Sequence, residues 1–369
     1  MKTTISQHQA LKKRSGLWTY ITTHEFATAL LTALVVVAIS LFLGRENNRV
    51  IAVDTRLALP GKSLLGFMSN WDGPAYLSIA QHGYSSAAAT NYFPLYPLII
   101  RGVAVVVRSP LYAGLLVSWA ALVGAICFYM RIVKKLFTAT ASLEALQAAL
   151  LFVLFPTGIF LLATYTESLF AMLSLGAIYY ALQKRTVLSA LLMAGATATH
   201  ENGVFVLVLV ALVLIEEGEE LRRVLLGAIV GSLGALSYMV FLAIRFHHPL
   251  AFVTAQRAHG WLASGYLADL KATFRPSDLI SLVFASGAAI YWWGRRKSFA
   301  LYTFLYFCIP LVGGQFAGYN RYVLMDFPIP LMVYGLVRKR SFAYAVVLAL
   351  FAVFWAYFTL QYAAGYIGS

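Results

Sequence analysis

An aspartate on a stiff turn is the residue of this sequence best suited to do chemistry. Asp72 lies between Trp71 and the pair Gly73-Pro74. Proline fixes its own φ and glycine permits unusual backbone angles, so this turn can present one carboxylate to a substrate. Such a carboxylate can act as a general base that takes a proton from a sugar hydroxyl. Two alternatives stay open, because a loop aspartate also commonly caps a helix or pairs with an arginine.

A second acid and two arginines offer complementary chemistry. Glu167 begins an apolar run, where a carboxylate either stabilises the first turn of a helix or helps to bind an acceptor. Arg321 lies at the start of a later apolar run, and Arg257 lies in a polar loop. Each arginine either reaches to lipid headgroups or clamps a lipid-linked phosphate, whose oxygens match the planar guanidinium.

A polar turn between two short apolar segments contains His200, Glu201 and Asn202. Such a turn is too polar to be buried unless it faces water or a substrate. A histidine beside a glutamate is weak evidence for a metal, and the chain has no His-x-x-x-His or His-Glu-x-x-His spacing. The sequence therefore indicates no metal or other cofactor.

The composition identifies the setting of these residues. The 369 residues are 61% hydrophobic and 11% charged, whereas soluble domains carry roughly 25% charged residues and about 45–50% apolar ones. The chain is therefore an integral membrane protein. Its net charge of +14 comes from short basic clusters between apolar runs, which orient a membrane protein and do not indicate nucleic-acid binding. Cys127 and Cys308 lie inside apolar runs, so we expect no disulfide or zinc site.

The apolar runs predict an all-α polytopic membrane protein, one transmembrane domain over 1–369 with about 11 crossings. A tail, 1–25, precedes the first span, 26–44, and a polar loop, 45–110, follows it. The end of that loop, 92–107, carries Arg101 at its middle, which is unfavourable in lipid, so we expect an interfacial helix there. Further spans are expected at about 111–133, 146–164, 168–183, 186–200, 203–215, 224–244, 278–293, 298–313, 322–337 and 342–363.

Every second connection is basic, which predicts the orientation of the chain. If the tail is cytoplasmic, the five clusters all fall inside; they are Lys134-Lys135, Lys184-Arg185, Arg222-Arg223, Arg295–Lys297 and Arg338–Arg340. The loops 45–110 and 245–277 then lie outside, with the turns at 164–168, 199–203 and 313–321. We expect acids, histidines and arginines to line one cavity at that outer face.

Four short motifs occur in order within residues 65–335, and together they resemble a known enzyme family. They are Trp71-Asp72-Gly73 with Tyr76, His82-Gly83-Tyr84 and Phe93–Pro97; Phe155-Pro156 with Tyr165–Phe170; Asn202-Gly203; and Arg321-Tyr322 with Phe327-Pro328. The family is the GPI mannosyltransferase 2 (PIG-V-like) family. It usually has an arginine two residues before the asparagine of the third motif, where this chain has His200.

The resemblance implies a GT-C-type bundle whose outer first loop carries interfacial helices and the catalytic base. It also implies inverting transfer of a mannose-type sugar from a polyprenyl-phosphate donor to a lipid or glycan acceptor. From residues and resemblance together, we expect Asp72 and Glu167 to act in catalysis. The side chains expected to bind substrates are Trp71, Tyr76, His82, Tyr165, His200, Glu201, Asn202, Arg257, Arg321 and Tyr322.

The chain lacks long luminal insertions, which favours a prokaryotic relative in the plasma membrane with its active site on the outer face. In a eukaryotic relative, the active site would face the lumen of the endoplasmic reticulum. The expected partners are the donor, the acceptor and membrane lipids, and no nucleic acid. A transporter or flippase of lipid-linked sugars is the main alternative, and a lipid-linked ligase or other acyltransferase is a third. One-sided polar residues and the lack of a repeat favour the transferase over the transporter.

Overall fold

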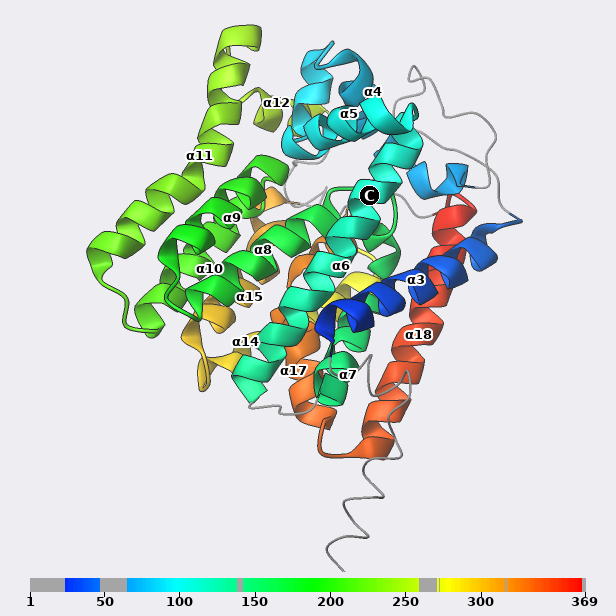
Figure 1. Ribbon diagram of the computed structural model, residues 1–369, viewed down its shortest axis with the longest axis vertical. Helices are drawn as coiled ribbons and strands as arrows, with labels where there is room; N and C mark the ends of the chain where they lie inside the picture. The colour runs from blue at the N-terminus through cyan, green and yellow to red at the C-terminus, as the bar shows by residue number, and fades with distance from the viewer. Residues whose placement is uncertain are drawn as a thin grey trace, which may run out of the picture.

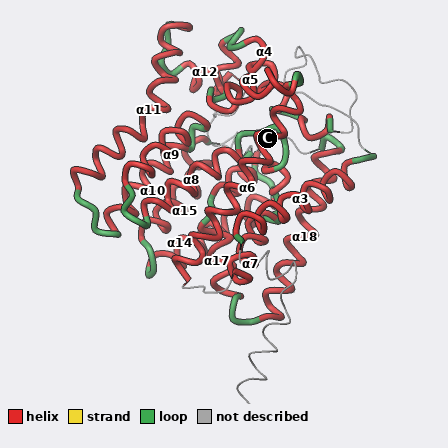
Figure 2. Tube along the Cα trace, viewed as in Figure 1, coloured by secondary structure: helices red, strands yellow, loops and turns green. Residues whose placement is uncertain are grey.

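Helices are the regular elements in the part of the chain that the computed structural model describes, residues 24–46, 65–137, 142–258, 271, 273–314, 316 and 318–366 (Figure 2). The expected tail, 1–25, lies outside this part apart from its last two residues. So do residues 47–64 of the first outer loop, and 259–270 and 272 of the loop 245–277.

Four helices are long and apolar enough to cross a membrane: α3 (Glu25–Gly44), α6 (Pro110–Phe137), α11 (Leu221–Phe246) and α18 (Ser341–Ala363). They identify a helical membrane protein. The other predicted spans also contain helices, but these are shorter or less apolar, so the number of crossings stays a prediction. They are α7 (Ser142–Val153), α8 (Glu167–Ala181), α9 (Thr186–Thr199), α10 (Gly203–Glu216), α14 (Pro276–Trp293), α15 (Lys297–Gly313) and α17 (Pro328–Val337).

Two predicted spans are interrupted. Helix α7 ends at Val153, and the stretch expected to continue it to residue 164 turns at Pro156 and passes through the 3-10 helix η3 (Gly158–Leu161). Proline cannot donate a backbone hydrogen bond, and irregular backbone is tolerated at this depth only inside the protein. Trp119 provides a hydrogen-bond partner for this irregular backbone, because its Nε1 donates to the carbonyl of Leu162 at 2.9 Å. The span expected at 322–337 likewise begins with α16 (Tyr319–Tyr322) and η4 (Val323–Met325) before α17 starts.

Helices of the first loop and of the loop 245–277 form a layer at one end of the bundle. Helices α4 (Gly73–His82), α5 (Leu95–Val107) and α12 (Ala251–Ala258) lie there beside the ends of α6 and α11 (Figure 1). Helix α5 is amphipathic, since it buries Tyr96 and Ile100 and exposes Leu98 and Arg101. Such a helix fits the interfacial position that the charge of Arg101 predicts.

Basic residues gather at the opposite end. Glu25, at the start of α3, accepts hydrogen bonds from Arg131 Nε at 2.8 Å and Lys134 Nζ at 2.7 Å near the end of α6. Just after α17, Arg338 Nη1 donates to the carbonyl of Phe137 at 3.1 Å. The contacts bring distant basic loops together, as the alternating pattern predicts. The side of the membrane that each end faces stays a prediction.

Candidate active site

The backbone next to Asp72 adopts an uncommon conformation that directs the Asp72 side chain to the interior of the protein. Trp71 has a φ of 63°, which is uncommon for a residue other than glycine. Gly73 packs so closely that a Cβ there would lie 2.6 Å from both Ser69 Oγ and Thr164 Oγ1. Asp72 occupies the N-cap position of α4, but its side chain makes no capping hydrogen bond. Of the alternatives that the sequence left open, helix capping is therefore wrong and pairing with an arginine is correct.

Two carboxylates and one guanidinium form the centre of the site. Arg321 donates through Nη1 to Asp72 Oδ2 at 2.6 Å and through Nε to Glu167 Oε1 at 2.5 Å. Asp72 and Glu167 are each 1% exposed, and Arg321 is 8% exposed. Ions buried this deeply need partners of opposite charge. We call these three residues the acid–arginine cluster.

The charge of Arg321 is secured by its neighbours. Burial alone would lower the pKa of the guanidinium, but the carboxylates of Glu167 and Asp72 raise it well above its usual range. The ring of Tyr165 also lies 4.9 Å from Arg321 Cζ, in cation–π geometry. The cluster therefore sets one guanidinium between two carboxyl groups.

Tyr165 holds the first loop against the segment that leads into α8. Its hydroxyl accepts a hydrogen bond from the backbone N–H of Asp72 at 3.1 Å and donates to the carbonyl of Asn70 at 2.9 Å. Asn70 is tied in turn to the last helix, because its Nδ2 donates to the carbonyl of Tyr362 at 2.9 Å. The sequence motifs did not single out Tyr362, which looks like one more aromatic residue of an apolar helix.

Tyr92 is a contact of Asp72 that the sequence also left unassigned. Its hydroxyl donates to Asp72 Oδ1 at 3.1 Å. Burial and the nearby Asp72 carboxylate raise the pKa of Tyr92 well above its usual range, so the hydroxyl keeps its proton. Tyr76 packs edge-on against Tyr92, with ring centroids 5.0 Å apart, and its hydroxyl lies 3.5 Å from Thr166 Oγ1. The only sequence signal for Tyr92 is its place next to the Phe93–Pro97 motif.

The turn at 200–202 adjoins the cluster through Tyr322. The ring of His200 lies 6.0 Å from that of Tyr322, the residue after Arg321. His200 Nδ1 lies 3.2 Å from both the backbone N of Asn202 and Oε2 of Glu201. The first contact needs an unprotonated nitrogen and the second a protonated one, so only one of them is a hydrogen bond at a time.

Two of the expected substrate-binding residues lie apart from the cluster. His82 is exposed at the far end of α4, and Arg257 is exposed on α12. In the described part of the chain, no group of three or more histidine, cysteine, aspartate or glutamate side chains is arranged to hold a metal ion.

Comparison with known proteins identifies relatives of the first half of the chain. Residues 18–219 match the family described as Mannosyltransferase (PIG-V). The chain is 34% identical over 152 residues to the human GPI alpha-1,6-mannosyltransferase 2, a match that covers 38% of this chain and 30% of that protein. A Drosophila melanogaster GPI mannosyltransferase 2 is 30% identical over 125 residues, covering 31% and 27% of the two chains. The matched family segment contains Asp72 and Glu167 and ends before Arg321.

Proposed function

Because the chain belongs to the PIG-V mannosyltransferase family, we propose that it transfers a mannose-type sugar from a polyprenyl-phosphate donor to a lipid or glycan acceptor. The observation that carries this proposal is the buried acid–arginine cluster. It joins residues of three motifs that are far apart in the sequence and places a carboxylate beside a hydrogen-bonding tyrosine. The proposed site faces the outer side of the membrane, in line with the basic loops expected inside.

In the proposed mechanism, Asp72 is the general base of an inverting displacement. The acceptor oxygen attacks the anomeric carbon from the face opposite the donor phosphate. The bond from that carbon to the phosphate oxygen breaks, and its electron pair leaves with the lipid phosphate. The hydroxyl proton passes to Asp72. A carboxylate oxygen has two lone pairs, so Oδ1 can receive this proton beside the hydrogen bond from Tyr92.

Glu167 and Arg321 have supporting roles in this mechanism. Glu167 holds Nε of Arg321, and Arg321 compensates the charge of Asp72 and fixes the direction of its carboxylate. The remaining nitrogen, Nη2, makes no hydrogen bond within the described residues and can meet a substrate oxygen. The mechanism does not use the expectation that Arg321 and Arg257 clamp the donor phosphate, which nothing in the structure tests. Two of the Arg321 nitrogens are already engaged by carboxylates.

The aromatic surroundings support a sugar site. Tyr76, Tyr165 and Trp71 lie on or beside the first loop, and Tyr322 leads to His200, Glu201 and Asn202. Apolar rings next to a few polar groups are typical of pockets that orient a small ligand. We propose that these residues bind the transferred sugar and the acceptor.

A transfer assay with purified protein in vesicles tests the proposal. Radiolabelled polyprenyl-phosphate mannose is supplied with a lipid extract as the acceptor source, and the products are separated by chromatography. We expect the label to move to the acceptor with wild-type protein and not with the Asp72→Asn variant. Movement of intact donor across the bilayer without transfer would instead identify a flippase.

A further inference from the structure

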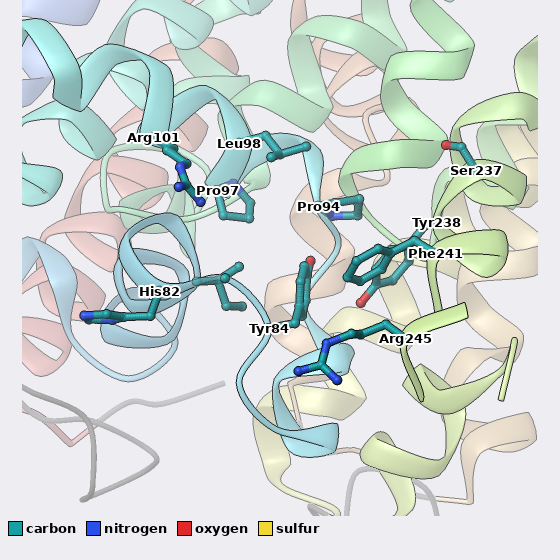
Figure 3. Close-up of a pocket in the computed structure, with 12 residues that line it drawn as sticks. His82, Tyr84, Pro94, Pro97, Leu98, Arg101, Ser237, Tyr238, Phe241 and Arg245 are labelled. Carbon is teal, nitrogen blue, oxygen red and sulfur yellow. The ribbon is translucent and has the colours of Figure 1, made fainter. Parts of the chain in front are cut away.

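A second candidate site lies at the end of α4 that is farther from Asp72. A pocket of about 520 Å³ is formed between α4, α5 and α11. Figure 3 shows Arg101 on the α5 side and the guanidinium of Arg245 extending from α11 toward Tyr84. Among the residues that the structure describes, no acidic side chain lines the pocket and neither Arg101 nor Arg245 forms an ion pair. The pocket therefore offers two uncompensated positive charges.

The rest of the wall is apolar and continues into an apolar surface. Ile79, Leu98 and Phe241 line the pocket with several aromatic and proline rings. Outside it, exposed side chains of α11 carry the apolar surface onward, with Val240 58% and Ile244 74% exposed. Positive charge beside an apolar surface on membrane helices matches an anionic headgroup carried on a hydrocarbon chain.

Tyr92 connects this pocket to the acid–arginine cluster. Two pocket residues hold the backbone next to its ring. The hydroxyl of Tyr84 donates to the carbonyl of Tyr92 at 2.6 Å, and the hydroxyl of Tyr238 donates to the carbonyl of Thr90 at 2.6 Å and lies 3.3 Å from that of Tyr92. The hydroxyl of Tyr92 itself donates to Asp72. Ile79, on the pocket wall, is also seven residues beyond Asp72 on the same helix, about 10 Å along its axis. The pocket wall is therefore linked to the proposed base through both Tyr92 and α4.

We propose that this pocket binds the phosphate group of a lipid through Arg101 and Arg245. The inference rests on the proposed function in one respect, because it identifies that lipid as the polyprenyl-phosphate donor. The cluster is a poor place for a phosphate, since its two carboxylates and one guanidinium leave a net negative charge. The pocket has the opposite charge and an apolar surface for the polyprenyl chain.

Direct binding to the full chain in detergent tests the proposal separately from transfer. The probe is a long-chain polyprenyl monophosphate without sugar, and phosphatidylglycerol and inorganic phosphate are compared with it. The variants are Arg101→Gln and Arg245→Gln, and Arg108→Gln is the matched control. Arg108 is exposed and follows α5 directly, but it does not line the pocket.

We expect each pocket variant to weaken polyprenyl-phosphate binding about 10-fold or more, because a charge-assisted bond to phosphate is lost. Arg108→Gln and Asp72→Asn should bind within about 2-fold of wild type. Equal binding by wild type and the double variant Arg101→Gln/Arg245→Gln would overturn the proposal. Phosphatidylglycerol or inorganic phosphate binding as tightly as the polyprenyl lipid would also overturn it. If the binding pattern holds but no mannose is transferred, the pocket stands and the proposed function fails.

Discussion

Replacing Asp72 by asparagine separates the chemical role of this residue from its structural role. Asparagine keeps the hydrogen bond from Arg321, because its carbonyl oxygen can face the guanidinium. Its NH2 group can donate to the hydroxyl oxygen of Tyr92, which reverses the direction of the hydrogen bond that Tyr92 donates to Asp72. The substitution also removes one of the two buried negative charges beside a single positive charge. We therefore expect the free energy of unfolding of Asp72→Asn to equal or exceed that of wild type.

The activity of the same variant should fall sharply. A positioned base contributes about 10²–10⁴-fold to rate, which corresponds to about 2.7–5.5 kcal/mol in the activation barrier. We expect mannose transfer at least about 100-fold slower at saturating donor, with little change in donor KM. Initial rates from the radiolabelled transfer assay, read beside thermal unfolding in the same detergent, measure both quantities.

Glu167→Gln is the matched control, since its amide oxygen can still accept from Arg321 Nε. We expect a smaller loss of activity because Asp72 remains. If Asp72→Asn keeps turnover within about 10-fold of wild type while Glu167→Gln is inactive, Glu167 is the base and the assignment is reversed. If both variants stay active, neither acid is the base, and Glu201 becomes the next residue to test.

Three other predictions follow from the packing and the charge pattern. Arg321→Met should destabilise the protein by about 3–5 kcal/mol, because two buried carboxylates lose their partner; denaturant unfolding checks this, and an unchanged midpoint would contradict the buried cluster. Gly73→Ala should destabilise by about 1–3 kcal/mol and reduce transfer, because the new methyl group collides with Ser69 Oγ; normal stability and activity would show that the turn adapts. With the native cysteines replaced, Ser86→Cys should react with an impermeant thiol reagent added outside and Ser142→Cys should not; the reverse pattern would invert the topology.

The sequence identified the members of the cluster but not their relationship. Asp72, Glu167 and Arg321 stood out because charged residues are rare in an apolar chain, and their motifs resemble those of one family. That Arg321 pairs with both acids depends on contacts across 249 and 154 residues, which no local pattern encodes. The residues next to Arg321 in the sequence therefore predicted only that it reaches lipid headgroups or binds a lipid-linked phosphate.

The helices could likewise be predicted only in part from the sequence. The predicted spans coincide with helices wherever an apolar run is uninterrupted, as in α6 and α11. The prediction of a helix over 146–164 was wrong beyond Val153, because hydrophobicity alone does not distinguish a helix from a buried irregular segment with a proline. The backbone of that segment is satisfied by side chains such as Trp119, which belong to other helices.

The long sequence distance between the residues that contact each other at the site affects when the site can form during synthesis. Asn70 and Tyr362 are 292 positions apart, and Asp72 and Arg321 are 249 apart. At roughly 5–20 residues per second, a ribosome needs roughly 12–50 s to pass from Asp72 to Arg321. Until then the two carboxylates have no guanidinium, so the emerging chain cannot close around them. The site is thus completed only when the last helices are inserted, and a chain that stops early has a membrane anchor and both acids but no assembled cluster.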